Sequence, residues 1–304
     1  MFSRSTNNHS RALVTPFGFR LVLALGVVGS VGGCGSCGDG GLEVGGDHPY
    51  LRCSAFPSPE GEWTVDGRQF RVDGRELTIE PPPTRIAVFS GSAPMAPPRT
   101  EDLQSIDAEL AIVVGGLGDD PTSLRQTVDT IAEKFPAIFI LGGRDDGRAW
   151  RELLKSEETG LERIIDGTGL VRVALGDHDL MLLSGSAGGR YARSATACGY
   201  GAGDLELRRE VDAPNGDRVV VAWQAPSTVR GLEGASAGDR ALQDLIEDTG
   251  ATGAIYASTG ESDPEQHLYA APPLVGSALE AADGVPIGPG HRVLTVGAAG
   301  LAIQ

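Results

Sequence analysis

Small polar and glycine-rich turns follow three short apolar segments in the first half of the chain. Ser90 and Ser92 follow the first segment, residues 115–119 follow the second, and residues 142–145 follow the third. Unbroken apolar runs of this length, separated by helical segments, are typical of buried strands in a parallel sheet. Such sheets place their sites in the loops at the carboxyl ends of the strands, so these turns are candidate site loops.

Two later turns complete a pattern of five. One contains Trp223 and Gln224, and the other contains Glu261 and Asp263. In order and spacing the five turns resemble the calcineurin-like metallophosphoesterases, which carry D-x-H, G-D-x-x-D, G-N-H-[DE], an H-x-P-like turn and G-H-x-H. The resemblance covers about residues 84–304. It implies an α/β fold, a four-layer α/β/β/α sandwich of two mixed sheets.

The side chains at the family's ligand positions have changed. A two-metal phosphoesterase needs a carboxylate that bridges cations roughly 3.5–4 Å apart, with His and Asp completing each shell. The positions that match the family motifs here are Ser90, Ser92, Gly116, Asp119, Gly143, Arg144, Gln224, Glu261 and Asp263. Serine, glycine and arginine are poor or impossible ligands for such metals. We therefore expect no cofactor; if the protein is active, the resemblance implies a divalent metal pair.

Some of these residues retain other possibilities. Glu261 and Asp263 could hold one hard cation such as calcium together with backbone oxygens, or they could be solvated loop acids. Arg144, at the tip of the third segment, could recognise a carboxylate or phosphate through a bidentate contact. The alternative for Arg144 is a salt bridge to Asp145, Asp146 or a neighbouring loop acid.

A serine hydrolase is a third hypothesis. Ser236 lies in a G-x-S-x-G sequence, with Asp263 and then His267 or His291 downstream in acid-then-base order. A nucleophile elbow places its serine directly at the tip of a strand. The preceding strand is expected to end near Ala225, so the sequence favours a loop that leads into a helix.

A second short constellation contains His178 and Asp179 in the sequence Gly-Asp-His-Asp. It looks like a metal-binding tripeptide. It also lies between two apolar segments that read as a hairpin, where Gly and Asp are favoured by turn geometry. We interpret it as a turn.

The first 33 residues have the features of a signal peptide. A basic region is followed by an apolar run too short to span a bilayer. The run ends in Val-Gly-Gly-Cys, which resembles the bacterial lipobox and implies lipid attachment at Cys34. This predicts a membrane-anchored lipoprotein of the cell envelope, in the outer membrane and facing the periplasm or the cell surface. The alternative is an ordinary secretory signal with a coincidental cysteine.

The four cysteines suit an exported protein. After lipidation of Cys34, three remain, and we expect Cys53 to pair with Cys198 because both lie near the folded part. Residues 34–59 are rich in Gly, Ser and Pro and are expected to form a flexible tether. The net charge of −16 repels phosphate backbones, so nucleic acid is not an expected partner.

Periodicity predicts the elements that must position these residues. Short strands around two Asp-Gly turns are expected over residues 60–83, leading into a main domain over residues 84–304. Asp120 is expected to cap a helix, and residues 184–203 are expected to form a loop. The sequence as a whole predicts an envelope pseudoenzyme that binds or scaffolds an unidentified protein or small molecule. The alternative is an active phosphoesterase with an atypical metal site around Asp119, Glu261 and Asp263.

Overall fold

The chain forms a mixed α/β domain. A computed structural model describes residues 42–45, 48–56, 60–89, 103–118, 120–155, 161–187, 196–226, 239–258, 269–271, 285–286 and 291–303. By its internal contacts the chain divides into residues 1–36 and 37–304, and every described residue belongs to the second unit. Within the described residues, no helix has the length and apolar character needed to cross a membrane.

The first sheet has six strands in the order β19-β18-β6-β7-β8-β9. Its strands are β6 (Arg85–Phe89), β7 (Leu110–Val114), β8 (Ala137–Ile140), β9 (Ile164–Asp166), β18 (His291–Gly297) and β19 (Gly300–Ile303). Strands β6 to β9 are parallel, whereas β18 runs antiparallel to β6 and β19 runs antiparallel to β18. The three apolar segments identified in the sequence are therefore adjacent parallel strands.

The second sheet has nine strands in the order β17-β16-β15-β14-β11-β10-β5-β4-β3. Its strands are β3 (Gly61–Val65), β4 (Arg68–Asp73), β5 (Glu76–Glu80), β10 (Arg172–Leu175), β11 (His178–Leu183), β14 (Arg218–Gln224), β15 (Gly253–Ser258), β16 (Tyr269–Ala271) and β17 (Val285–Pro286). The strands expected over residues 60–83 are thus part of this sheet. Their first turn is a tight one, with positive φ at Asp66 (49°) and Gly67 (78°).

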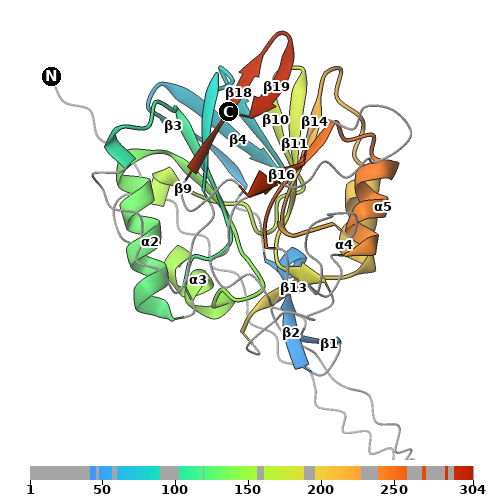
Figure 1. Cartoon of the computed structure of the whole chain (residues 1–304). Coiled ribbons are helices and arrows are strands. Elements are labelled where there is room, and N and C mark those ends of the chain that lie inside the picture. Colours follow the sequence, from blue (N-terminus) through green and yellow to red (C-terminus); the bar gives the residue numbers. More distant parts are fainter. Residues whose placement is uncertain are drawn as a thin grey trace, which may run out of the picture. The chain divides into compact units, whose positions relative to one another are not determined.

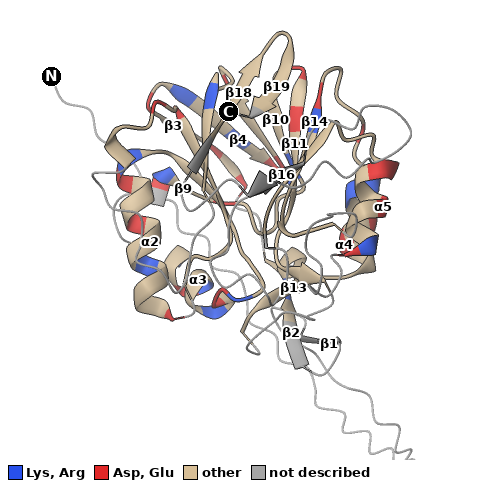
Figure 2. Ribbon diagram, viewed as in Figure 1, with Lys and Arg blue, Asp and Glu red and all other residues tan. Residues whose placement is uncertain are grey.

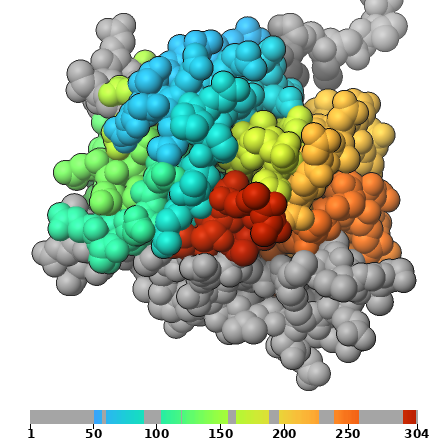
Figure 3. Space-filling model, turned by 90° about the horizontal axis from the view of Figure 1, so that it is seen from above, coloured from blue at the N-terminus to red at the C-terminus, as the bar shows by residue number. Residues whose placement is uncertain are grey.

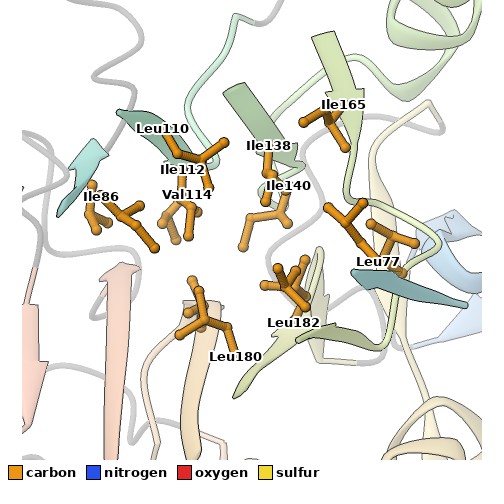
Figure 4. Close-up of a cluster of buried hydrophobic side chains, with 14 of the residues drawn as sticks. Leu77, Ile86, Leu110, Ile112, Val114, Ile138, Ile140, Ile165, Leu180 and Leu182 are labelled. Carbon is orange, nitrogen blue, oxygen red and sulfur yellow. The ribbon is translucent and has the colours of Figure 1, made fainter. Parts of the chain in front are cut away.

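The two sheets pack face to face through a common apolar core (Figure 4). The six-stranded sheet contributes residues such as Ile86, Ile112 and Ile138, and the nine-stranded sheet contributes residues such as Leu77 and Leu182. All five side chains are fully buried. The strands that supply them are short and apolar, as strands covered on both faces must be.

Helices cover the outer face of each sheet (Figure 1). Helices α2 (Pro121–Lys134) and α3 (Gly147–Leu154) pack on the six-stranded sheet, and α4 (Ala202–Arg209) and α5 (Arg240–Asp248) pack on the nine-stranded sheet. Asp120 caps α2 as expected, because its carboxylate accepts hydrogen bonds from the N–H groups of Thr122 and Ser123.

Basic and acidic residues both occur along α2 and α5 (Figure 2). Arg125 pairs with Asp129 at 2.6 Å on α2, and Arg240 pairs with Asp244 at 2.9 Å on α5. Both pairs have the i, i+4 spacing that brings side chains together on one helix face. These faces are therefore polar and directed to solvent.

A third, four-stranded sheet changes the interpretation of two segments. It contains β1 (Leu42–Gly45), β2 (His48–Arg52), β12 (Ser186–Ala187) and β13 (Cys198–Tyr200), and a 3-10 helix (Cys53–Ala55) follows β2. Part of the segment expected to be a flexible tether, and part of the expected loop over residues 184–203, are therefore strands. These strands are two to five residues long, too short to show a recognisable period in the sequence.

The last two strands, β18 and β19, belong to the six-stranded sheet and also form hydrogen bonds with residues of the nine-stranded sheet and the turn before β14. In the space-filling view these strands, in red, lie between the teal early segment and the yellow-green middle segment of the chain (Figure 3). The N–H of Leu301 in β19 donates to the Asp217 carboxylate at 2.8 Å, and the imidazole of His178 lies 3.0 Å from the carbonyl oxygen of Gly297. The end of the chain is therefore part of the folded domain.

Candidate functional site

The candidate loops lie together at one edge of the two sheets. The carboxyl ends of β7 and β8 meet there because these strands are parallel neighbours, and the N–H of Gly115 donates to the Ile140 carbonyl at 2.8 Å. The carboxyl end of β11, in the nine-stranded sheet, lies at the same edge, because the N–H of Gly185 donates to the Leu141 carbonyl at 2.7 Å. The sequence predicted this convergence for β7 and β8 but not for β11.

The loop after β7 has a backbone conformation that favours glycine. Gly115 and Gly116 have φ values of 64° and 70°, and Gly118 has a φ of 149°. L-residues rarely adopt these values, because Cβ clashes with the neighbouring backbone. Gly116 stands where the family resemblance places a metal-bridging aspartate, so this position lacks a ligand and has a backbone suited to glycine.

Asp145 holds the two loops together. Its carboxylate accepts hydrogen bonds from the N–H of Gly142 at 2.6 Å and from the N–H of Gly118 at 3.2 Å. The side chain is fully buried, and burial raises its pKa to about 6 although the N–H groups of Gly142, Gly118, Leu117 and Gly116 act to lower it. The sequence suggested Asp145 only as a salt-bridge partner of Arg144, which is half-buried, and contained no signal for this role in joining the two loops.

Trp223 fills the space in front of these loops. Its indole is 2% exposed and belongs to the core between the sheets. A Cβ added to Gly142 would lie 2.6 Å from the indole Nε1, and one added to Gly143 would lie 2.9 Å from its Cζ3. Side chains at these glycines would therefore clash with the indole.

Gln224 faces the opposite side of the nine-stranded sheet. Trp223 belongs to the core between the sheets, whereas its neighbour Ala222 packs under α4 and α5, and strand alternation gives Gln224 the same side as Ala222. Of the two residues considered as the equivalent of the family's histidine, only Trp223 faces the loops.

Several buried polar atoms near this edge lack partners. Among the described residues, Trp223 Nε1, Ser184 Oγ, Ser186 Oγ and Gln224 Oε1 have no hydrogen-bond partner. Ser186 lies close to the loop after β8, because a Cβ on Gly143 would be 2.7 Å from its Oγ. Buried polar atoms without partners are uncommon and point to a bound water, ion or ligand.

The His178 and Asp179 constellation is an internal ion-pair network at the start of β11. Asp179 pairs with Arg218 at 2.7 Å and with Arg172 at 2.9 Å. The Nδ1 of His178 accepts the N–H of Asp217 at 2.9 Å. The two-residue turn itself is Gly176-Asp177, because Leu175 pairs with His178. The side chains that resembled a metal tripeptide are thus engaged within the protein.

The two cysteines that we expected to pair form a disulfide. Cys53 and Cys198 are joined with an S–S distance of 2.00 Å and a Cα–Cα distance of 5.1 Å. Both residues are buried, and the bond connects the segment after β2 to β13. Its sequence separation of 145 residues means that it closes a long loop of the chain.

The remaining candidates lie outside the described residues. These are Cys34, Ser90, Ser92, Asp119, Ser236, Glu261 and Asp263, together with His267. Within the part of the chain that the structure describes, no group of three or more His, Cys, Asp or Glu residues is arranged to hold a metal ion.

Comparisons with known proteins give no family. No protein-family model matches the chain, and no curated protein matches it. Four chains of solved structures match. One, from a crystal structure, shares 12% sequence identity at a TM-score of 0.49, and the match covers 73% of this chain and 98% of the other. A likeness this distant supports no conclusion about function.

Proposed function

We propose that the protein is a lipid-anchored envelope protein with a metallophosphoesterase-like sandwich fold that is non-catalytic and acts in binding or scaffolding. The observation that supports this most is the position of Trp223. Its buried indole occupies the space next to Gly142 and Gly143, at the edge where the family resemblance places the metals. A metal pair there would need both new ligands and the removal of the indole.

The arrangement of layers supports the fold part of this proposal. Two mixed sheets face each other, and helices lie on both outer faces. Strands β6, β7 and β8, which precede the first three of the five turns, are adjacent and parallel. Fold and activity are separate claims, and the family's fold can persist when its chemistry is lost.

Hydrolysis of a generic aryl phosphodiester by the full-length chain, loaded in turn with manganese, iron, zinc and calcium, tests the absence of catalysis. We expect no turnover above that of an Asp119→Ala variant. Asp119 is the acid that a rebuilt metal site would need, so this variant separates true activity from a contaminating enzyme. Turnover that Asp119→Ala abolishes would establish the alternative, an active phosphoesterase.

A fluorophosphonate probe tests the serine hydrolase hypothesis in the same preparation. We expect wild-type protein and a Ser236→Ala variant to label equally weakly. Labelling that disappears in Ser236→Ala would identify Ser236 as a nucleophile. It would show that the edge around Trp223 is not the functional site.

The anchor is tested by expressing the full-length precursor in bacteria. We expect wild-type protein to partition into detergent and to carry a diacylglycerol mass at Cys34. A Cys34→Ser variant should lose both properties, because the acyl chains supply the membrane affinity. Equal partitioning of the two proteins would contradict a lipid anchor at this residue.

A further inference from the structure

The loops after β7 and β8 surround one carboxylate with backbone donors. Asp145 accepts the N–H groups of Gly142 and Gly118, and the N–H groups of Gly116 and Leu117 also stabilise its ionised form. Hydrogen bonds to an ionised acceptor are about twice as strong as those between neutral groups. The arrangement is that of an anion-binding loop with a side chain of the protein as its ligand.

The glycines explain how the loop reaches this arrangement. Gly115 and Gly116, with φ near 64° and 70°, turn the chain after β7, and the next three successive N–H groups, those of Gly116, Leu117 and Gly118, face the Asp145 carboxylate. Successive N–H groups arranged in this way form anion-binding concavities in other proteins. The loop therefore has the geometry of a receptor, beyond what a simple connection between β7 and α2 requires.

A second donor lies beside this loop without an acceptor. The Nε1 of Trp223 is buried and, within the described residues, has no hydrogen-bond partner. It lies against the same glycines, because a Cβ on Gly115 would be 2.9 Å from it and one on Gly142 would be 2.6 Å from it. The indoles of Trp63 and Trp150 differ, since each donates to an oxygen at 3.0 Å.

We propose that these loops form a receptor for a small carboxylate, in which the side chain of Asp145 is the resident ligand and the indole N–H of Trp223 is a neighbouring donor. When the side chain is shortened, a free carboxylate of the same size can take its place. This inference concerns binding and does not depend on whether the protein is catalytic.

Chemical rescue tests the proposal in the full-length chain. Asp145→Ala retains Cβ and removes the carboxylate, and formate supplies the missing group. We expect Asp145→Ala to have a lower Tm than wild type and formate to raise it by several degrees, saturating with concentration, because a ligand stabilises the state that binds it. Chloride at equal ionic strength should not do so, and wild type should not respond to formate.

Asp146 provides a matched control next in the sequence. Its carboxylate also accepts two backbone N–H groups, from Arg148 at 2.9 Å and Ala149 at 3.1 Å, but it is only half-buried at the start of α3. Asp146→Ala should lose stability without rescue by formate, because water can reach those donors. Equal stabilisation of both variants would show a general salt effect and overturn the proposal.

The indole N–H signals give a local readout. The chain has three tryptophans, so a ¹H–¹⁵N spectrum contains three indole signals, and Trp223→Phe identifies one of them. In Asp145→Ala, formate should shift the Trp223 signal and leave those of Trp63 and Trp150 in place. If the variant does not fold alone, its refolding yield in formate and in chloride replaces Tm. If formate neither stabilises Asp145→Ala nor shifts the Trp223 signal, the proposal is overturned.

Discussion

Two buried aspartates, Asp145 and Asp179, are stabilised in different ways. Both side chains have 0% exposure. Asp179 lies between two guanidinium groups, with Arg218 at 2.7 Å and Arg172 at 2.9 Å. Asp145 accepts backbone N–H groups from the glycine loops, and burial raises its pKa to about 6.

This difference distinguishes the anion environments at the two opposite ends of the strands. Asp179 is part of a charge-compensated network at the amino end of β11, so its environment is fixed by other side chains. Asp145 depends on backbone donors at the carboxyl ends of β7 and β8, which could serve another anion. The Asp-His-Asp sequence looked more like a functional site, yet the backbone loop has the properties of a receptor.

The largest expected effect comes from breaking the charged pair. Arg218→Ala should lower the free energy of unfolding by about 3–5 kcal/mol, because it leaves Asp179 buried without its main partner. Denaturant unfolding measures this change. Arg125→Ala on the outer face of α2 is the control and should cost only about 0.3–0.5 kcal/mol. Similar losses for both variants would contradict the buried network.

Removing the acid held by the backbone should cost less. Asp145→Ala leaves at least two buried N–H groups without an acceptor, at about 1–3 kcal/mol each, but it also relieves the burial of a charge. We expect a net loss of about 2 kcal/mol in the same unfolding measurement, smaller than for Arg218→Ala. A loss as large as that of Arg218→Ala would mean that the two acids are equally dependent on their partners.

The pKa of Asp145 predicts how stability changes with pH. Because its folded pKa is raised above the unfolded value of 3.8, the folded state binds protons more readily than the unfolded state. The contribution of this group to stability is fully present below pH 3.8 and is lost as the pH rises through about 6, the folded pKa. Acidification from about pH 7 to about pH 5 should therefore increase the free energy of unfolding by about 1 kcal/mol.

The pH effect must be separated from that of Asp166, whose pKa is also raised by burial. The difference between wild type and Asp145→Asn in denaturant unfolding, followed across this pH range, isolates the contribution of Asp145. A difference that is constant with pH would contradict the raised pKa.

The smallest expected effect is at the half-buried neighbour. Asp146→Ala should lower the free energy of unfolding by about 1 kcal/mol, because it removes the carboxylate that caps α3. Thermal or denaturant unfolding measures the change. A loss equal to that of Asp145→Ala would mean that burial of the acid has no energetic consequence.

The regular elements were the most predictable part of the molecule. Strand β7 and helix α2 have long apolar patterns, and α2 also has the cap and proline that mark a helix start. The short strands β12 and β13 and the eight-residue helix α4 were not predicted, because segments of this length contain too few residues to show a period.

The candidate site was only partly predictable. The positions of the glycine loops followed from the rule that parallel strands end at one edge. The role of Trp223 did not, because sequence alone does not reveal which face of β14 it occupies relative to Gly142 and Gly143. The backbone bonds of Asp145 depend on φ values in a loop, and the run of glycines was the only available signal.

The metal content of the full-length chain tests the central claim most directly. Protein loaded separately with manganese, iron, zinc and calcium, then desalted, is analysed by plasma mass spectrometry. The proposal that Trp223 and the glycine loops have replaced the metal centre predicts less than one tightly bound metal per chain. About two metals per chain, lost in Asp119→Ala, would contradict it and establish a metal site built from other residues.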